Sequence, residues 1–134
     1  MRYLYILFLF GALSCRKDST DDQQMITFKV KYEITSSDPT SLVQVRFTKA
    51  DGGDSIANPG IIPALVDVPW SYQGKFTVNP LAANPPNRSV GFTVLDNQAG
   101  LLTEKIFVND SLVTQAVGST TSTLIGVRLS YTLK

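Results

Sequence analysis

The chain has 134 residues with 12 basic and 11 acidic side chains, so its formal charge is close to zero. This balance argues against nucleic-acid binding, which needs a clear excess of basic residues. The sequence has no histidine and a single cysteine, which excludes Ser-His, Cys-His and His-ligated metal sites. A Ser-Lys or carboxylate pair stays open by composition, but no spacing indicates one. We therefore expect a protein that is not an enzyme and needs no cofactor.

The first fifteen residues, MRYLYILFLFGALSC, resemble a bacterial lipoprotein signal. Arg2 gives a positive start, and the apolar run from Tyr3 to Leu13 is shorter than the roughly 20 residues of a membrane-spanning helix. Small residues precede Cys15, which has no partner thiol for a disulfide. We expect removal of residues 1–14 and acylation of Cys15. The alternative is an ordinary cleaved signal with a chance cysteine.

Residues 15–25 are polar and lack periodicity, which predicts a solvated tether between lipid and domain. Arg16 stands where an aspartate signals inner-membrane retention in many enteric bacteria, so we expect the outer membrane. Lys17 with the acidic residues after it partly resembles a surface-transfer signal of the Bacteroidetes, although Ser19 and Thr20 interrupt the acidic run. The periplasmic and the surface-exposed face both stay open.

From Ile26 onward the sequence alternates apolar and polar residues, which predicts β-strands. Turn residues recur at intervals of roughly ten residues, as in an antiparallel sandwich. Residues 26–134 are therefore expected to form one all-β domain, an antiparallel β-sandwich of seven to eight strands that is immunoglobulin-like or transthyretin-like. A closed barrel is the alternative. The expected strands are 26–34, 43–47, 61–70, 72–78, 90–94, 102–108, 113–117 and 125–133.

The strand pattern also predicts how some strands are connected. Residues 109–111, Asn-Asp-Ser, indicate a hairpin between residues 102–108 and 113–117. Residues 79–88 contain three prolines, which predicts a long connection between two sheets. Prolines 63 and 69 restrict the third strand to its middle or to a sheet edge. The first and last strands are long and free of proline, so we expect them to be central and to pair with each other.

Three segments, VKYEITSS (30–37), VPWSYQGKFTV (68–78) and IFVNDSLVTQ (106–115), resemble the extracytoplasmic domain of the mycobacterial MmpS proteins. The resemblance covers most of the chain from Ile26 to Leu133. It implies a small β-sandwich tethered at its N-terminus that assists an RND-type transporter. The chain departs from the family in three ways. Glu104 and Tyr131 lie near the places of a common cysteine pair, the tether is acyl, and the loops at 50–60 and 81–88 are longer.

Two groups of residues are candidates for ligand binding. Trp70 and Tyr72 lie in the densest aromatic stretch, where exposed rings could stack on sugar or lipid. We favour a core position for Trp70, as in many sandwiches. Asp51 and Asp54 could offer oxygens to calcium, but a calcium loop gathers more carboxylates at alternating positions, so a solvated turn is favoured and no metal site is expected.

Three Asp-Ser tripeptides resemble the sequon that Bacteroidetes use for O-glycosylation of exported proteins. They place candidate acceptors at Ser19, Ser55 and Ser111, all in expected tether or turn positions. Asp-Ser is also common in turns for conformational reasons, so this stays a hypothesis.

Two functions from different classes follow from these observations. The first is a non-catalytic accessory lipoprotein of the bacterial cell envelope that docks on an envelope protein, as the MmpS resemblance implies. The second is an autonomous binding module for a glycan or another small ligand, using sandwich loops or a sheet face. In both cases acylated Cys15 holds the domain at a membrane.

Overall fold

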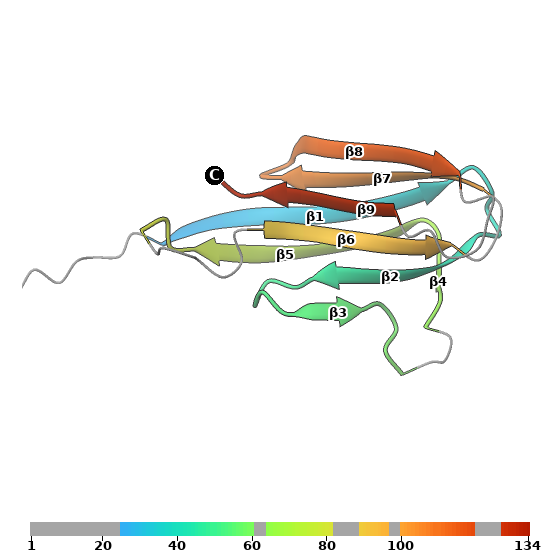
Figure 1. Ribbon diagram of the computed structural model, residues 1–134, viewed down its shortest axis with the longest axis horizontal. Coiled ribbons are helices and arrows are strands. Elements are labelled where there is room, and N and C mark those ends of the chain that lie inside the picture. The colour runs from blue at the N-terminus through green and yellow to red at the C-terminus, as the bar shows by residue number, and fades with distance from the viewer. Residues whose placement is uncertain (1–24, 61–63, 82–88, 97–99, 120–126) are drawn as a thin grey trace, which may run out of the picture.

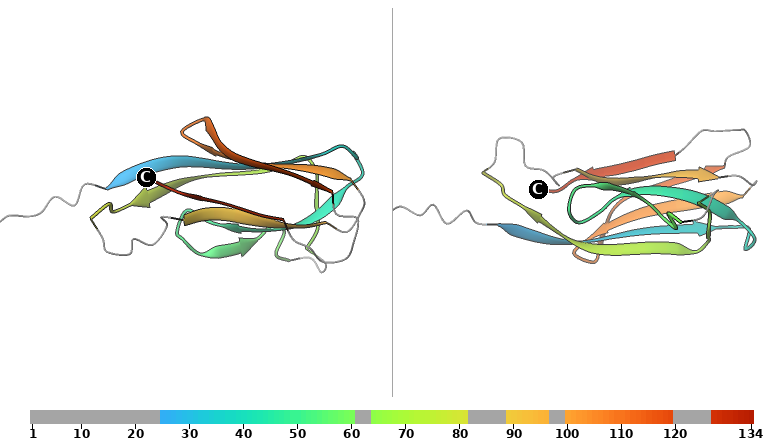
Figure 2. Two further views of the ribbon diagram at one scale, coloured as in Figure 1. Left: turned by 45° about the horizontal axis from the view of Figure 1, so that its top comes forward. Right: turned by 90° about the horizontal axis from the view of Figure 1, so that it is seen from below.

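The computed structural model describes residues 25–60, 64–81, 89–96, 100–119 and 127–134. Two antiparallel sheets pack face to face as a β-sandwich (Figures 1 and 2). Sheet A has the order β5 (Trp70–Val78), β1 (Ile26–Ser36), β7 (Leu101–Val108) and β8 (Ser111–Ser119). Sheet B has the order β3 (Asp54–Ile56), β2 (Leu42–Thr48), β6 (Ser89–Asp96) and β9 (Val127–Thr132), and β4 (Val66–Asp67) also pairs with β2. The all-β sandwich expected from the sequence is confirmed.

The core lies between the two sheets because each long strand alternates buried apolar and outward polar residues. Strand β1 shows the rule: its inward side chains from Phe28 to Ile34 are buried, and its lysines and glutamate point outward. Full burial of each such aliphatic or aromatic side chain contributes roughly 1.5 to 3 kcal/mol. The buried apolar residues of the main strands include Phe28, Val30, Tyr32, Ile34, Val43, Val45, Phe47, Phe76, Val90, Phe92, Val94, Leu102, Ile106 and Leu129.

Tyr32 connects the two sheets at the centre of the core. It is fully buried, and its hydroxyl donates a hydrogen bond of 3.0 Å to the carbonyl oxygen of Thr48 on β2. Burial raises the pKa of the Tyr32 phenol. Its ring lies 5.9 Å from the ring of Tyr72 and 5.3 Å from that of Phe92. The hydrogen bond satisfies the one polar atom of this buried ring and fixes sheet A relative to sheet B.

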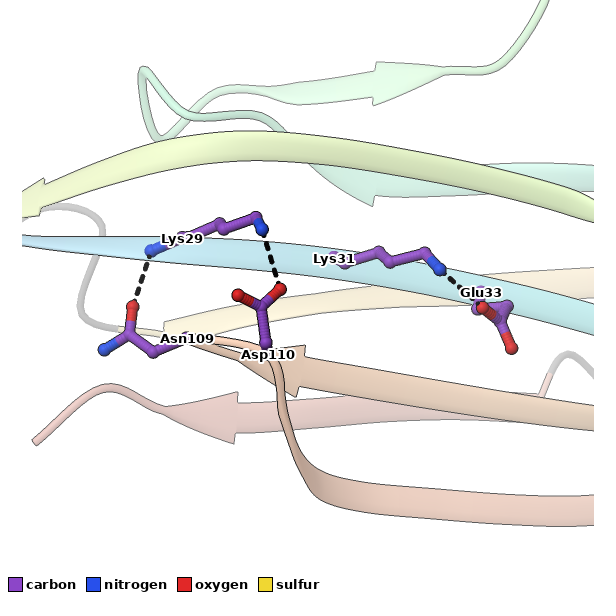
Figure 3. A network of polar contacts seen from close by, with 5 residues as sticks. All are labelled: Lys29, Lys31, Glu33, Asn109 and Asp110. Atoms are coloured by element: carbon purple, nitrogen blue, oxygen red, sulfur yellow. Dashed lines mark hydrogen bonds and ion pairs between the residues drawn. The ribbon is translucent and has the colours of Figure 1, made fainter.

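The predicted hairpin between residues 102–108 and 113–117 is confirmed as β7 and β8. Asn109 and Asp110 make its turn with positive φ values of 50° and 66°, the two left-handed residues that a type I′ turn requires. The turn is also attached to β1. The side chain of Asn109 accepts a hydrogen bond of 3.0 Å from the Lys29 amide, and Asp110 forms an ion pair of 2.7 Å with Lys29 (Figure 3).

The expected third strand, residues 61–70, is wrong in extent. Only Val66 and Asp67 pair there, as β4 at the edge of sheet B, and Trp70 already belongs to β5. Residues 61–63 lie outside the described ranges. Pro69 follows Val68 in a cis peptide bond between β4 and β5. Two short strands, β3 and β4, raise the number described to nine.

The expected pairing of the first and last strands is also wrong. Strand β1 is central, but its partners are β5 and β7, whereas β9 pairs with β6 at an edge of the other sheet. Length and the absence of proline show that a strand can be central but not which strand lies beside it. No described strand bridges the two sheets, so the sandwich replaces the barrel alternative. The predicted connection at 79–88 does join sheet A to sheet B, and residues 82–88 of it lie outside the described ranges.

Candidate functional site

The outer face of sheet B carries a row of residues from three neighbouring strands. Because Val45 and Phe47 of β2 point into the core, Arg46 between them points outward. The strand register places Arg46 opposite Thr93 of β6, and Thr93 opposite Arg128 of β9. Paired residues share a face of a sheet, so two arginines lie on either side of one threonine.

A second row runs beside the first and contains a glycine at its centre. Thr48 of β2, Gly91 of β6 and Ser130 of β9 follow the same register as the first row. A Cβ atom at Gly91 would come within 2.6 Å of the Leu129 carbonyl oxygen, closer than atoms can pack. Only glycine fits without a backbone shift, and its missing side chain leaves the middle of the row open.

These two rows form the floor of a cavity of about 660 Å³. We call it the sheet B groove and define it by six residues, Arg46, Thr48, Gly91, Thr93, Arg128 and Ser130, all of which line it. Strand β3 and Pro59 close one side with Asp54 and Ile56. The volume lies within the range of about 300 to 1,000 Å³ that is typical of small-molecule sites.

The two arginines of the groove, like Lys75 and Lys134, have no charged partner among the described residues. Arg46 and Arg128 are exposed, and neither makes an ion pair with any described residue. Asp54 is the single acidic residue among those that line the groove, and it lies opposite Thr48 in the second row. The floor of the groove is therefore positive along the row through Thr93.

Three lysines on the outer face of sheet A have carboxylate partners, and Figure 3 shows two of these pairs. Lys31 lies 2.7 Å from one carboxylate oxygen of Glu33, and Lys105 lies 3.9 Å from the other. The Lys31 ammonium also lies 5.5 Å from the centre of the Phe107 ring, a cation–π contact. With the Lys29 and Asp110 pair described above, three of the four lysines on this face have a carboxylate partner, and Lys75 of β5 makes no ion pair with a described residue.

Glu104 on β7 is a carboxyl group buried in the sandwich core. It lies in the inward row between Leu102 and Ile106, opposite Ile34 of β1 and Ala116 of β8. Its side chain is 1% exposed, and neither carboxyl oxygen has a hydrogen-bond partner among the described residues. Burial raises the pKa of Glu104 to about 8, because an apolar environment disfavours the charged form. The group is therefore neutral at pH 7.

Strand β8 is an edge strand without the usual protection. It pairs with β7 alone among the described strands, and its nine residues, SLVTQAVGS, include no charge and no proline. Leu112 and Val117 are about half exposed, at 48% and 55%. Natural edge strands normally carry charges, prolines or bulges that prevent pairing with another chain. The bulge between Ile106 and Phe107 lies in the pairing with β7 near the start of β8, so the rest of the edge is regular.

Trp70 and Tyr72 lie on the inward side of β5, away from the sheet B groove. Both are half-buried and pack against the core, with ring centres 5.4 Å and 4.5 Å from that of Phe47. These contacts agree with the core position that the sequence favours for Trp70, and ligand binding by either ring stays a prediction.

Asp51 and Asp54 lie in and beside the turn between β2 and β3, and both are exposed. Asp51 accepts a 2.9 Å hydrogen bond from the Gly53 amide, which lowers the pKa of Asp51, and its carboxylate lies 3.4 Å from the Lys49 ammonium. The described residues include no group of three or more possible metal-binding side chains. Asp51 therefore stabilises the turn, and Asp54 lines one side of the groove.

The modification candidates are placed only in part. Ser111 is exposed at the start of β8, and Ser55 is half-buried on β3, where it contributes to the wall of the groove. Cys15 and Ser19 lie outside the described residues, as do the expected signal and nearly all of the expected tether. Within the described ranges, no helix has the length and apolar character to span a membrane.

None of the six residues that define the groove was singled out from the sequence, including Arg46, Gly91 and Arg128. Each lies at an outward position of a strand that the alternating pattern predicts. That pattern says which face of the sheet the residue is on, but not which residues lie beside it. Their meeting depends on the order β2, β6, β9 and on the register. Comparison with known proteins adds no relative: no protein-family model matches the chain, and no curated protein matches its sequence.

Proposed function

We propose that the protein is a non-catalytic lipoprotein of the bacterial cell envelope that acts as a binding module, with the sheet B groove as its ligand site. The observation that carries this proposal is the groove itself, a cavity of about 660 Å³ whose floor holds two arginines that make no ion pair within the described part of the chain. Ligand sites are concave and carry a few polar or charged groups that orient the ligand, and this groove has both features. In this proposal acylated Cys15 holds the domain at the outer membrane.

A groove-filling variant tests the ligand site. The full chain, purified in detergent, is screened against a panel of neutral and acidic saccharides by calorimetry. Thr93→Trp places a large ring on the groove floor and should weaken binding of any hit at least tenfold. Gln73→Trp puts the same ring on the outer face of sheet A and should leave affinity unchanged. Equal affinity of both variants and the parent chain would overturn the proposal.

Membrane attachment has its own test. Labelled palmitate should enter the protein in its native host, and Cys15→Ala should move the protein to the soluble fraction. A Cys15→Ala chain that stays membrane-bound would contradict the anchor while leaving the groove unaffected.

Strand β8 favours a second function, docking on an envelope protein, for which the MmpS resemblance implies an RND-type transporter. An extended, uncharged strand of the partner would pair with β8, since the edge offers backbone groups and apolar side chains without charge. Crosslinking in intact cells followed by mass spectrometry should give one membrane-protein partner in stoichiometric amount. Val117→Lys should remove that product, and Ser71→Lys on the opposite edge of sheet A should keep it. Loss in both variants, or in neither, would exclude β8 as the docking edge.

A further inference from the structure

We propose that the sheet B groove binds an acidic saccharide, with Arg46 and Arg128 holding one oxyanion of the ligand between them. This inference rests on the proposed ligand site and names the chemistry that the site selects.

The spacing of the arginines suits a single anionic group. Arg46 and Arg128 lie on either side of Thr93, so their Cα atoms are two strand spacings apart, about 10 Å. Two long side chains that start at this distance can approach one carboxylate or phosphate from opposite sides. The guanidinium group presents parallel N–H donors that match an oxyanion in pairs.

The charge arrangement favours an anion over a neutral ligand. The two arginines make no ion pair with described residues. By contrast, Lys29, Lys31 and Lys105 of sheet A each lie within ion-pair distance of Glu33 or Asp110. Asp54 of β3 lies opposite Thr48, in the other row. A ligand that places its anionic group over Thr93 therefore meets two cations.

The rest of the groove suits a sugar ring. Thr48, Thr93 and Ser130 bring hydroxyl groups to the floor, and Ile56 and Pro59 bring apolar carbon to one side. Sugars combine hydroxyl groups with an apolar C–H face, so they use both kinds of surface. Because the anion could also come from free phosphate, the test includes inorganic phosphate as a separate probe.

The experiment measures affinity of the full chain in detergent for a galacturonic acid trimer and for neutral galactotriose. The acidic trimer should bind at least tenfold more tightly. Arg46→Gln and Arg128→Gln should each weaken its binding about ten- to a hundredfold, the effect of one charged hydrogen-bonding group. Lys75→Gln removes the same charge from the outer face of sheet A and should change nothing. The double variant Arg46→Lys with Arg128→Lys should bind the acidic trimer more tightly than the glutamine variants but less tightly than the parent chain. Lysine keeps the positive charge but lacks the paired N–H donors of the guanidinium group.

Each other outcome has a defined meaning. Equal binding of both trimers, unaffected by the arginine variants but abolished by Thr93→Trp, overturns the acidic ligand and keeps the groove as a binding site. If inorganic phosphate binds as tightly as the acidic trimer, the claim that the ligand is a saccharide is overturned. If neither trimer binds, the acidic saccharide is excluded as the ligand. The proposed function is still tested separately, by the saccharide panel and the Thr93→Trp variant. Melting curves of all variants show whether the fold is retained.

Discussion

Sheet A pairs three of its four outward lysines with carboxylates, all except Lys75, and buries one carboxyl group, Glu104, whereas the described residues of sheet B bury no charge and leave two exposed arginines of one groove unpaired. Both sheets have alternating strands and similar apolar inner faces, so the fold does not require this difference. Most outer lysines of sheet A have a carboxylate partner within the molecule, while the two groove arginines of sheet B are available to a ligand. The four predictions below test this contrast, from the largest expected effect to the smallest.

Glu104→Leu should have the largest effect, and its size should depend on pH. Between about pH 4.5, the ordinary pKa, and about pH 8, the raised pKa, the folded chain keeps a proton that the unfolded chain releases. The free energy of unfolding of the parent chain therefore falls as pH rises through this range. At pH 9 the variant should be more stable by roughly 3 to 5 kcal/mol.

Urea unfolding of both chains between pH 4 and 9 measures the effect. The stability of Glu104→Leu should be nearly flat where that of the parent chain declines. Glu33→Gln, at a partly exposed carboxylate on the neighbouring strand, should keep the decline. An unchanged slope in the Glu104→Leu chain would show that the buried carboxyl group is not its source.

Gly91→Ala should destabilise sheet B by about 1 to 3 kcal/mol, the usual effect of an atom forced into a packed position. The new Cβ atom would meet the Leu129 carbonyl oxygen at 2.6 Å, so β6 and β9 must separate. Gly60→Ala is the matched control, because nothing lies within 4 Å of its added atom. Thermal unfolding should show a lower melting temperature only for Gly91→Ala, and equal values for the two variants would contradict the close approach.

Thr93→Glu should make the outer face of sheet B resemble that of sheet A. The new carboxylate would lie opposite both Arg46 and Arg128, and each cross-strand pair of opposite charge contributes roughly 0.2 to 1 kcal/mol. We expect a gain in stability of about 0.5 to 1 kcal/mol that shrinks at high salt, together with loss of acidic trimer binding. Thr93→Gln, of similar size without charge, should give no gain. A Thr93→Glu chain that still binds the acidic trimer would mean that the arginines do not hold the anion.

Glu33→Gln makes the opposite change and should have the smallest effect. It leaves Lys31 and Lys105 without the carboxylate that they share. Pairs at partly exposed sites contribute little, so we expect a loss of about 0.5 kcal/mol that disappears at high salt. Urea unfolding at low and high ionic strength checks it, and a salt-independent loss would point to packing as the cause.

The sequence predicts the local features of the fold and misses the long-range ones. Alternation marked the long strands, and the Asn109 and Asp110 turn marked one hairpin, because both signals are carried by neighbouring residues. The stretch 61–70 is apolar but contains prolines, and only β4 forms there. The neighbours of β9 and the row from Arg46 to Arg128 depend on pairings between distant parts of the chain, which no local pattern specifies. The alternation places Glu104 at an inward position between apolar residues. Its burial is unexpected because a carboxyl group is normally charged and exposed to solvent.

The central place of β1 in sheet A has a mechanical consequence. The chain ahead of Ile26 continues directly into this strand, which is hydrogen-bonded to β5 on one side and to β7 on the other. Antiparallel hydrogen bonds run across the strands, so a pull along β1 loads many of them at once instead of opening them in sequence. If the domain is pulled through its N-terminus, the force acts first on β1, and the domain should therefore resist mechanical unfolding there.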